Sequence, residues 1–201
     1  MSLQPAQDLF TEAMNFIWEP CHDGQPFHVT AFDPGGATAW GVTFETWAAW
    51  QKMHGELASI GVFRNLPRGE FLPLYRTLFW NACCCAALGP IGIQVFDAAV
   101  NCGPRRAAKF LQAVVEVPQD GAIGPITIAA ALADDQRLLA RRICSARDAF
   151  YATLNNARYF ERGWDARAEA CRDLVLSLLP PAALPWPKTD PTAPPVSPQT
   201  E

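Results

Sequence analysis

The stretch PIGIQVFDAAVNCGP, residues 90–104, decides the fold of this chain. Pro90 stands where a first-turn proline belongs, and the run from Ile91 to Asn101 is largely apolar, which predicts a buried helix. Gly103 stops that helix and Pro104 opens the next one. We therefore expect residues 91–101 to form the central helix of a mainly α fold.

Helices are also predicted on the N-terminal side of this stretch. Apolar residues recur at helical spacing over about residues 5–18, so that Glu19 stands at the C-terminal end of a first amphipathic helix. Thr43 is a suitable N-cap for a second helix over residues 44–54, and Gly55 fits the position that ends it. A turn-rich loop separates the two helices.

Three more helices are predicted on the C-terminal side. Gly124-Pro125 starts a short helix, a long helix runs over residues 134–156, and a last one over residues 165–179. Residues 180–201 contain eight prolines among 22 residues, which predicts an extended or disordered tail. No long alternating pattern indicates strands.

The composition limits the class of protein. The 201 residues are 50% hydrophobic and 18% charged, enough for one full core or two small ones. A net charge of -4 argues against a binder of nucleic acid or anionic membrane. The longest weakly charged stretch, residues 82–100, contains Gln94 and Asp97, so we expect no transmembrane helix.

The cysteines and the N-terminus bear on the compartment. Seven cysteines, an odd number without a Cys-x-x-Cys pair, predict reduced and mostly buried thiols. The first eight residues lack the cationic and continuous apolar segments of a secretory signal. We therefore expect synthesis in the cytoplasm without a signal peptide.

The loop between the first two helices holds the first candidates for chemistry. Its core is Asp33-Pro34-Gly35-Gly36-Ala37-Thr38, and Glu19 precedes it directly after Trp18. Cleavage of a glycosidic bond needs one carboxylic acid as proton donor and a second carboxylate on the opposite face. Taken alone, a glutamate at a helix end such as Glu19 is typical of a solvated surface residue, and an aspartate before Pro-Gly-Gly such as Asp33 is typical of a turn-capping residue.

A metal site is the alternative that the histidines suggest. His22, His28 and His54, with Asp23, have no spacing that places two imidazoles on one helical face. No histidine is positioned beside a cysteine for nucleophilic catalysis, and no nucleotide-binding fingerprint is present. We expect neither a metal nor an organic cofactor.

Several ordered motifs resemble one known family. Over about residues 8–175 the chain is similar to glycoside hydrolase family 108, the phage-lysin and secretion-activator-type N-acetylmuramidases with an associated predicted peptidoglycan-binding module. The motifs are Trp18-Glu19, Gly24 to His28, Asp33 to Thr43, Tyr75-Arg76, Phe79-Trp80, Phe96 to Pro104, Leu111-Gln112 and Asp120 to Thr127.

The resemblance implies a small lysozyme-like helical domain with a glycine-rich active-site loop. It implies a catalytic part over residues 5–80 and a helical part with the peptidoglycan-binding module over residues 81–179, packed as one unit, before the tail at 180–201. The implied substrate is bacterial peptidoglycan, cut at the β-1,4 bond between N-acetylmuramic acid and N-acetylglucosamine.

The resemblance also implies the catalytic residues. Glu19 corresponds to the general acid, and Asp33 and Thr38 to the loop residues that assist it. In the family pattern the glutamate is followed at once by glycine, whereas here Pro20, Cys21, His22 and Asp23 intervene before Gly24. Either these four residues are an insertion that leaves Glu19 as the acid, or Asp23 takes that position.

Three further residues are candidates for binding substrate. Asp97 and Asn101 are four residues apart and so share a helix face; they contact substrate, or they bond to each other and hold the loop in place. Trp40 is a candidate for stacking on a sugar ring, as is Trp47, and both are also suited to the core.

The sequence also leads to an expectation of how the protein reaches the cell wall, and it leaves two alternative functions open. Without a signal, the protein is expected to reach the cell wall or periplasm after holin-dependent release or through a dedicated secretion machinery. A second hypothesis is that the insertion has disabled catalysis and the chain is a peptidoglycan-binding or structural component of a phage or secretion particle. A third is a metal-dependent amidase.

Overall fold

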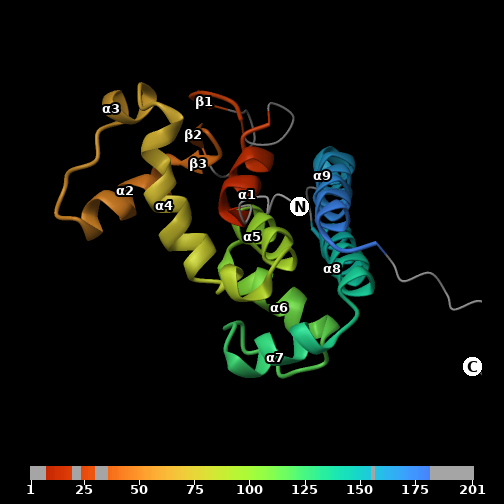
Figure 1. Ribbon diagram of the computed structural model, residues 1–201. Coiled ribbons are helices and arrows are strands. Elements are labelled where there is room, and N and C mark those ends of the chain that lie inside the picture. The colour runs from red at the N-terminus through yellow and green to blue at the C-terminus, as the bar shows by residue number, and fades with distance from the viewer. Residues whose placement is uncertain (1–7, 20–23, 30–35, 155–156, 182–201) are drawn as a thin grey trace, which may run out of the picture.

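Helix α5, Ile91–Cys102, lies at the centre of the fold, as expected (Figure 1). The computed structural model describes residues 8–19, 24–29, 36–154 and 157–181, the last range with side chains from residue 162. Every side chain of α5 from Ile91 to Ala99 is buried. The long helices packed against it are α1 (Leu9–Ile17), α6 (Pro104–Val114), α8 (Gln136–Tyr151) and α9 (Ala157–Leu178).

One glycine ends α5, and another allows a neighbouring segment to pack closely against it. Gly103 has a φ of 83° and ends the helix, and Pro104 starts α6, both as predicted. At Gly92 a Cβ would lie 2.1 Å from the carbonyl oxygen of Cys85, so only glycine lets the short 3-10 helix η3, Cys85–Leu88, approach α5 this closely. The cysteine-rich segment is thereby fixed against the central helix.

A small antiparallel sheet follows α1 and was not predicted from the sequence. Its order is β1-β2-β3, with β1 at His28–Val29, β2 at Ala37–Ala39 and β3 at Val42–Thr43. The β2-β3 turn consists of Trp40 and Gly41, both with positive φ, which suits a tight two-residue hairpin. Strands of two or three residues are too short to show alternation in the sequence.

The segment from the sheet to α5 is a series of short helical elements around an aromatic cluster. Thr43 caps the first of them with its side chain, and Gly55 follows its end with a φ of 77°, as predicted. Fully buried Phe63 packs against the rings of Phe44, Trp47 and Phe71. The elements are α2 (Phe44–Met53), α3 (Ile60–Arg64), the 3-10 helix η1 (Arg68–Phe71), α4 (Leu72–Tyr75) and the π-helical η2 (Arg76–Asn81).

The C-terminal part consists of helices joined by short connections. Helix α7, Pro125–Ala133, starts at the predicted Gly124-Pro125 pair, and the Asp135 side chain caps α8. Helix α9 begins at Ala157 and not at Asp165. Helices α8 and α9 pack against each other, and tertiary packing stabilises helical structure beyond what a local cap specifies.

The cysteines of the described residues agree with the prediction of free thiols. Cys83, Cys85, Cys144 and Cys171 are buried, while Cys84 and Cys102 are half-buried. The described helices include none that is both long and apolar enough to cross a membrane. Cys21, the Asp33-Pro34-Gly35 part of the predicted glycine-rich loop and tail residues 182–201 lie outside the described residues.

Candidate active site

A pocket of about 400 Å³ lies where the hairpin meets the end of α5 and the pair α8–α9. One part of its wall is polar and combines Thr38, Thr43, Asn101 and Tyr151. The other part of the wall is apolar and is formed by Val100, Phe150, Leu154 and Trp164. Residues from the two ends of the chain therefore meet in one cavity, and two of them, Thr38 and Asn101, were candidates from the sequence.

Thr38 reaches the pocket from the middle of the small sheet. It pairs with His28 of β1 and with Thr43 of β3, which fixes its backbone on both sides. Its hydroxyl is half-buried and donates a hydrogen bond of 3.3 Å to the carbonyl oxygen of Gly36. With its proton engaged there, the hydroxyl oxygen offers an acceptor to the pocket.

Glu19 stands just beyond α1 and is exposed. Its amide donates to the carbonyl oxygen of Phe16, and its own carbonyl oxygen accepts a 3.0 Å hydrogen bond from the amide of Gly24. A Cβ on Gly24 would lie 2.1 Å from the carbonyl oxygen of Trp18. The residues that flank segment 20–23, Glu19 and Gly24, are therefore in direct contact.

The catalytic candidates are brought together only in part. Glu19 is not among the residues that line the pocket, but the chain after Gly24 bonds to the hairpin, since Gln25 accepts a 2.8 Å hydrogen bond from the amide of Trp40. Asp33 and the alternative acid Asp23 lie outside the described residues. The structure thus places Thr38 and leaves the two loop aspartates undescribed.

Trp40 has a structural position in the turn. Its indole N–H donates to the carbonyl oxygen of Leu66, and its own carbonyl oxygen accepts a 2.7 Å hydrogen bond from the Tyr75 hydroxyl. Its ring is half-buried and does not line the pocket, while Trp47 is buried in the aromatic cluster. Trp40 fixes the hairpin that carries Thr38.

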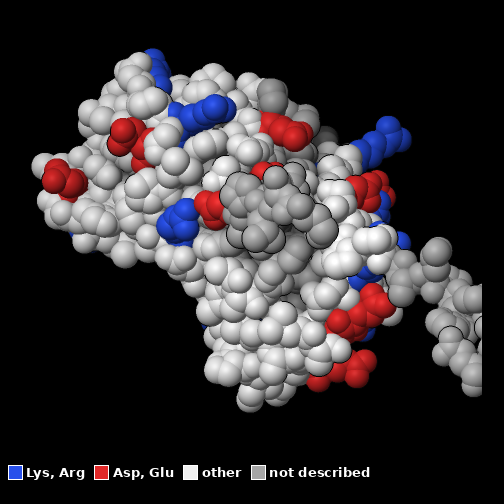
Figure 2. Space-filling model, viewed as in Figure 1, with Lys and Arg blue, Asp and Glu red and all other residues white. Residues whose placement is uncertain are grey.

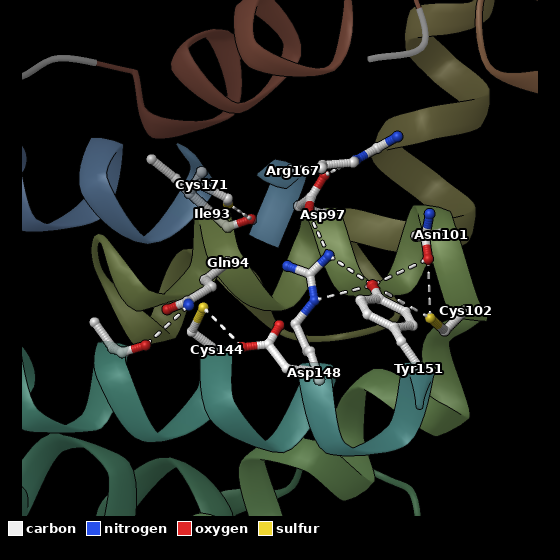
Figure 3. A network of polar contacts seen from close by, with 12 residues as sticks. Ile93, Gln94, Asp97, Asn101, Cys102, Cys144, Asp148, Tyr151, Arg167 and Cys171 are labelled. Carbon is white, nitrogen blue, oxygen red and sulfur yellow. Dashed lines mark hydrogen bonds and ion pairs between the residues drawn. The ribbon is translucent and has the colours of Figure 1, made fainter. Parts of the chain in front are cut away.

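The expectation that Asp97 contacts substrate needs correction. Its side chain is fully buried between two arginines, with 2.7 Å from Oδ2 to Arg147 and 2.8 Å from Oδ1 to Arg167 (Figure 3). Burial alone raises the pKa of Asp97, but the two guanidinium groups outweigh it and hold that pKa below the usual value. The carboxylate has no surface left for a sugar, and it pairs with these cations and not with Asn101.

Asn101 is linked to this ion pair through a residue that the sequence did not reveal. The Tyr151 hydroxyl lies 3.1 Å from Oδ1 of Asn101 and 3.0 Å from a guanidinium nitrogen of Arg147. Burial raises the pKa of the Tyr151 phenol well above its usual value, which keeps it protonated. One feature of the sequence could have indicated this network. Arg147 falls on the same face of its helix as the apolar residues Ile143 and Cys144, and a buried arginine needs a partner.

The described histidines and the surface charges indicate no metal site and no strongly charged patch on the face in view. On the face shown in Figure 2, acidic and basic side chains are scattered among neutral residues. His28 and His54 bond to nearby backbone carbonyls, and His22 lies outside the described residues. Within the part of the chain that the structure describes, no three metal-ligating side chains gather.

The chain matches two family models over adjacent regions. Residues 22–103 match the family model described as Glycosyl hydrolase 108, and residues 104–169 match the model described as Predicted Peptidoglycan domain. The pocket draws residues from both matched regions. These features define the class as a mainly helical glycosyl hydrolase with a peptidoglycan-binding domain.

A solved structure agrees over almost the whole chain. The protein titled "Structure of Brucella abortus SagA" is 32% identical, with 89% of this chain and 100% of that chain covered and a TM-score of 0.78. Among curated proteins, none matches. The chain belongs to the glycosyl hydrolase 108 family.

Proposed function

We propose that the protein is an N-acetylmuramidase that cleaves the β-1,4 bond between N-acetylmuramic acid and N-acetylglucosamine in peptidoglycan. The observation that carries this proposal is the pocket in which Thr38 of the hairpin meets Asn101 and the aromatic side chains of α8 and α9. Aromatic faces next to hydrogen-bonding groups suit the alternating apolar and hydroxyl surfaces of a sugar.

We assign one role in the reaction to each of three residues. Glu19 donates a proton to the leaving glycosidic oxygen as the bond to the anomeric carbon breaks. Asp33 stabilises the positive charge that develops on the sugar ring or activates the water that attacks it. Thr38 accepts a hydrogen bond from that water and orients it, which its hydroxyl oxygen is free to do once its own proton is bonded to Gly36.

The contact between Glu19 and Gly24 favours Glu19 over Asp23 as the acid. The family pattern has glycine directly after the glutamate, and here the hydrogen bond from the Gly24 amide closes the chain so that this glycine is again next to Glu19. The absence of space for a Cβ at Gly24 supports the same conclusion. Residues 20–23 then form an insertion that leaves the acid in place.

Release of dye from labelled sacculi by three proteins tests the assignment. Glu19→Gln is expected to lower turnover by about a hundredfold to ten-thousandfold with an unchanged melting temperature, since it removes only the transferable proton. Asp23→Asn is the matched control and is expected to retain wild-type activity. Full activity of Glu19→Gln together with loss in Asp23→Asn would move the acid to residue 23.

One observation favours a second candidate function. The match to the hydrolase family begins at residue 22, beyond Glu19, and coincides with the inserted residues. In this alternative the protein binds peptidoglycan without cutting it, as a component of a phage or secretion particle. Binding to sacculi by wild type and Glu19→Gln alike, with no release of dye by either, would establish it. In both cases we propose delivery to the wall through a holin or a secretion machinery.

A further inference from the structure

The wall of the pocket contains a hydrogen-bond network with a fixed direction. Arg147 is fully buried and held by Asp97 Oδ2, and it donates to the Tyr151 hydroxyl from Nε at 3.3 Å and from an Nη at 3.0 Å (Figure 3). A guanidinium has only donors and stays charged, so both bonds occupy lone pairs of the phenol oxygen. The phenol proton then points to Asn101.

This direction settles the orientation of the Asn101 amide. Oδ1 accepts from the Tyr151 hydroxyl at 3.1 Å and from the Cys102 thiol at 3.1 Å. A flipped amide would place its N–H₂ group against the phenol proton that Arg147 directs toward residue 101, so the phenol excludes that orientation; the Cys102 sulfur, which can donate or accept, does not decide it. The nitrogen of Asn101 is therefore held on the side away from Tyr151 and Cys102, as Figure 3 shows.

The nitrogen of Asn101 is available to a ligand. Asn101 is half-buried and lines the pocket, and among the described residues none accepts a hydrogen bond from its Nδ2. Phe150, Leu154 and Trp164 form the apolar part of the same cavity. A fixed N–H donor beside an apolar wall is complementary to a group that joins a carbonyl oxygen to a methyl group.

We propose that this pocket recognises an acetamido group of the glycan, with its carbonyl oxygen on Nδ2 of Asn101 and its methyl against the apolar wall. Tyr151 is a positioning residue that holds the amide in the required orientation, and Arg147 in turn directs the phenol proton. The inference deepens the proposed muramidase function, because it names the substituent by which the site selects its substrate.

Binding of two soluble sugars tests the proposal. The probes are a tetramer of N-acetylglucosamine and its de-N-acetylated counterpart, measured by titration calorimetry on the Glu19→Gln protein at about pH 6, where amino groups are ionised. The acetylated tetramer is expected to bind about tenfold more tightly, the effect of one hydrogen bond to an oriented donor.

Asn101→Asp is expected to reverse this selectivity. Its carboxylate still accepts from Tyr151 but now presents an oxygen to the pocket, which repels a carbonyl and attracts an ammonium group. The de-N-acetylated tetramer should then bind about tenfold more tightly than the acetylated one. Asn65→Asp, at the exposed asparagine that follows α3, adds the same charge away from the pocket and should leave the preference for the acetylated tetramer.

Tyr151→Phe isolates the positioning role. Without the hydroxyl, the amide of Asn101 is free to flip, and the preference for the acetylated tetramer should fall by severalfold. In the Asn101→Asp background the same change should leave the selectivity where it was, because a carboxylate presents oxygen in either orientation. A residue that merely supported the fold would not show this dependence on residue 101.

Three results would overturn the proposal. They are equal affinity for the two tetramers, binding of neither, and the same behaviour of Asn101→Asp and Asn65→Asp. Cleavage of sacculi is measured separately, so a protein that cuts peptidoglycan without selecting the acetamido group refutes this inference alone. A protein that selects the group without cutting refutes the muramidase function alone.

Discussion

Replacing Asp97 by asparagine is expected to destabilise the protein strongly without touching the pocket directly. The carboxylate is fully buried and bonds at 2.7 and 2.8 Å to Arg147, which is fully buried, and to Arg167, which is 8% exposed. Removing one partner of a buried ion pair costs about 3–5 kcal/mol, because the remaining charge stays desolvated. Here two cations are left without their counterion.

Urea unfolding and thermal melting give the magnitude. For a chain of this size, a loss of about 3–5 kcal/mol corresponds to a melting temperature lower by about 6 to 20 °C. The matched control is Asp173→Asn, which breaks the exposed pair with Arg172 and should cost less than about 1 kcal/mol. A cost of Asp97→Asn no larger than that of this control would contradict the expected penalty for leaving the two buried cations unpaired.

The pH dependence of the same pair has a defined sign. The pKa of Asp97 is below its usual value of 3.8 in the folded protein, so its contribution to stability is complete above that value. The contribution is lost as the pH falls through the lower folded pKa. The difference in unfolding free energy between wild type and Asp97→Asn should therefore stay constant from neutral pH down to about 5 and shrink below 3.8.

Five further outcomes are expected. Thr38→Val should lower kcat on sacculi by about ten- to a hundredfold with an unchanged melting temperature, because it removes the acceptor for the attacking water. Gly92→Ala should cost about 1–3 kcal/mol in urea unfolding, since its Cβ meets backbone, whereas Gly163→Ala, a helical position with open space, should gain about 0.5–1 kcal/mol. Burial and then the charge of Asp165 raise the pKa of Asp148, so Asp148→Asn should be more stable than wild type at pH 7 and lose this advantage below pH 3.8. Activity should survive a chelator, because the histidine spacing suits no metal site; loss of activity on adding it would favour the amidase hypothesis.

The helices around α5 were predictable because their boundaries depend on local chemistry. Thr43 as a cap, Gly55 and Gly103 with positive φ, and the prolines that start α6 and α7 act within one or two turns of the chain. A helical stretch from Pro73 to Trp80 was predictable from its apolar spacing and corresponds to α4 and η2, whereas the 3-10 segments η1 and η3 and the π character of η2 were not predictable. They follow packing around the buried aromatic cluster and leave no periodic pattern in the sequence.

The site was predictable only where a motif carried it. Thr38 and Asn101 belong to motifs that resemble those of the family, and both line the pocket. Tyr151 and Trp164 reach the same cavity because α8 and α9 pack against each other and against α5, and no local signal specifies that packing. The two partners of Asp97 were missed for the same reason. Arg147 and Arg167 lie 50 and 70 residues away from it in the chain.

Mass spectrometry of the soluble products from purified sacculi tests the central claim most directly. Sacculi are incubated with wild type and with Glu19→Gln, and the fragments are analysed for their reducing ends. Wild type is expected to release disaccharide-peptides that end in reducing N-acetylmuramic acid, and the variant is expected to release none. Fragments that end in reducing N-acetylglucosamine, free peptides, or undigested sacculi with bound wild-type protein would contradict it.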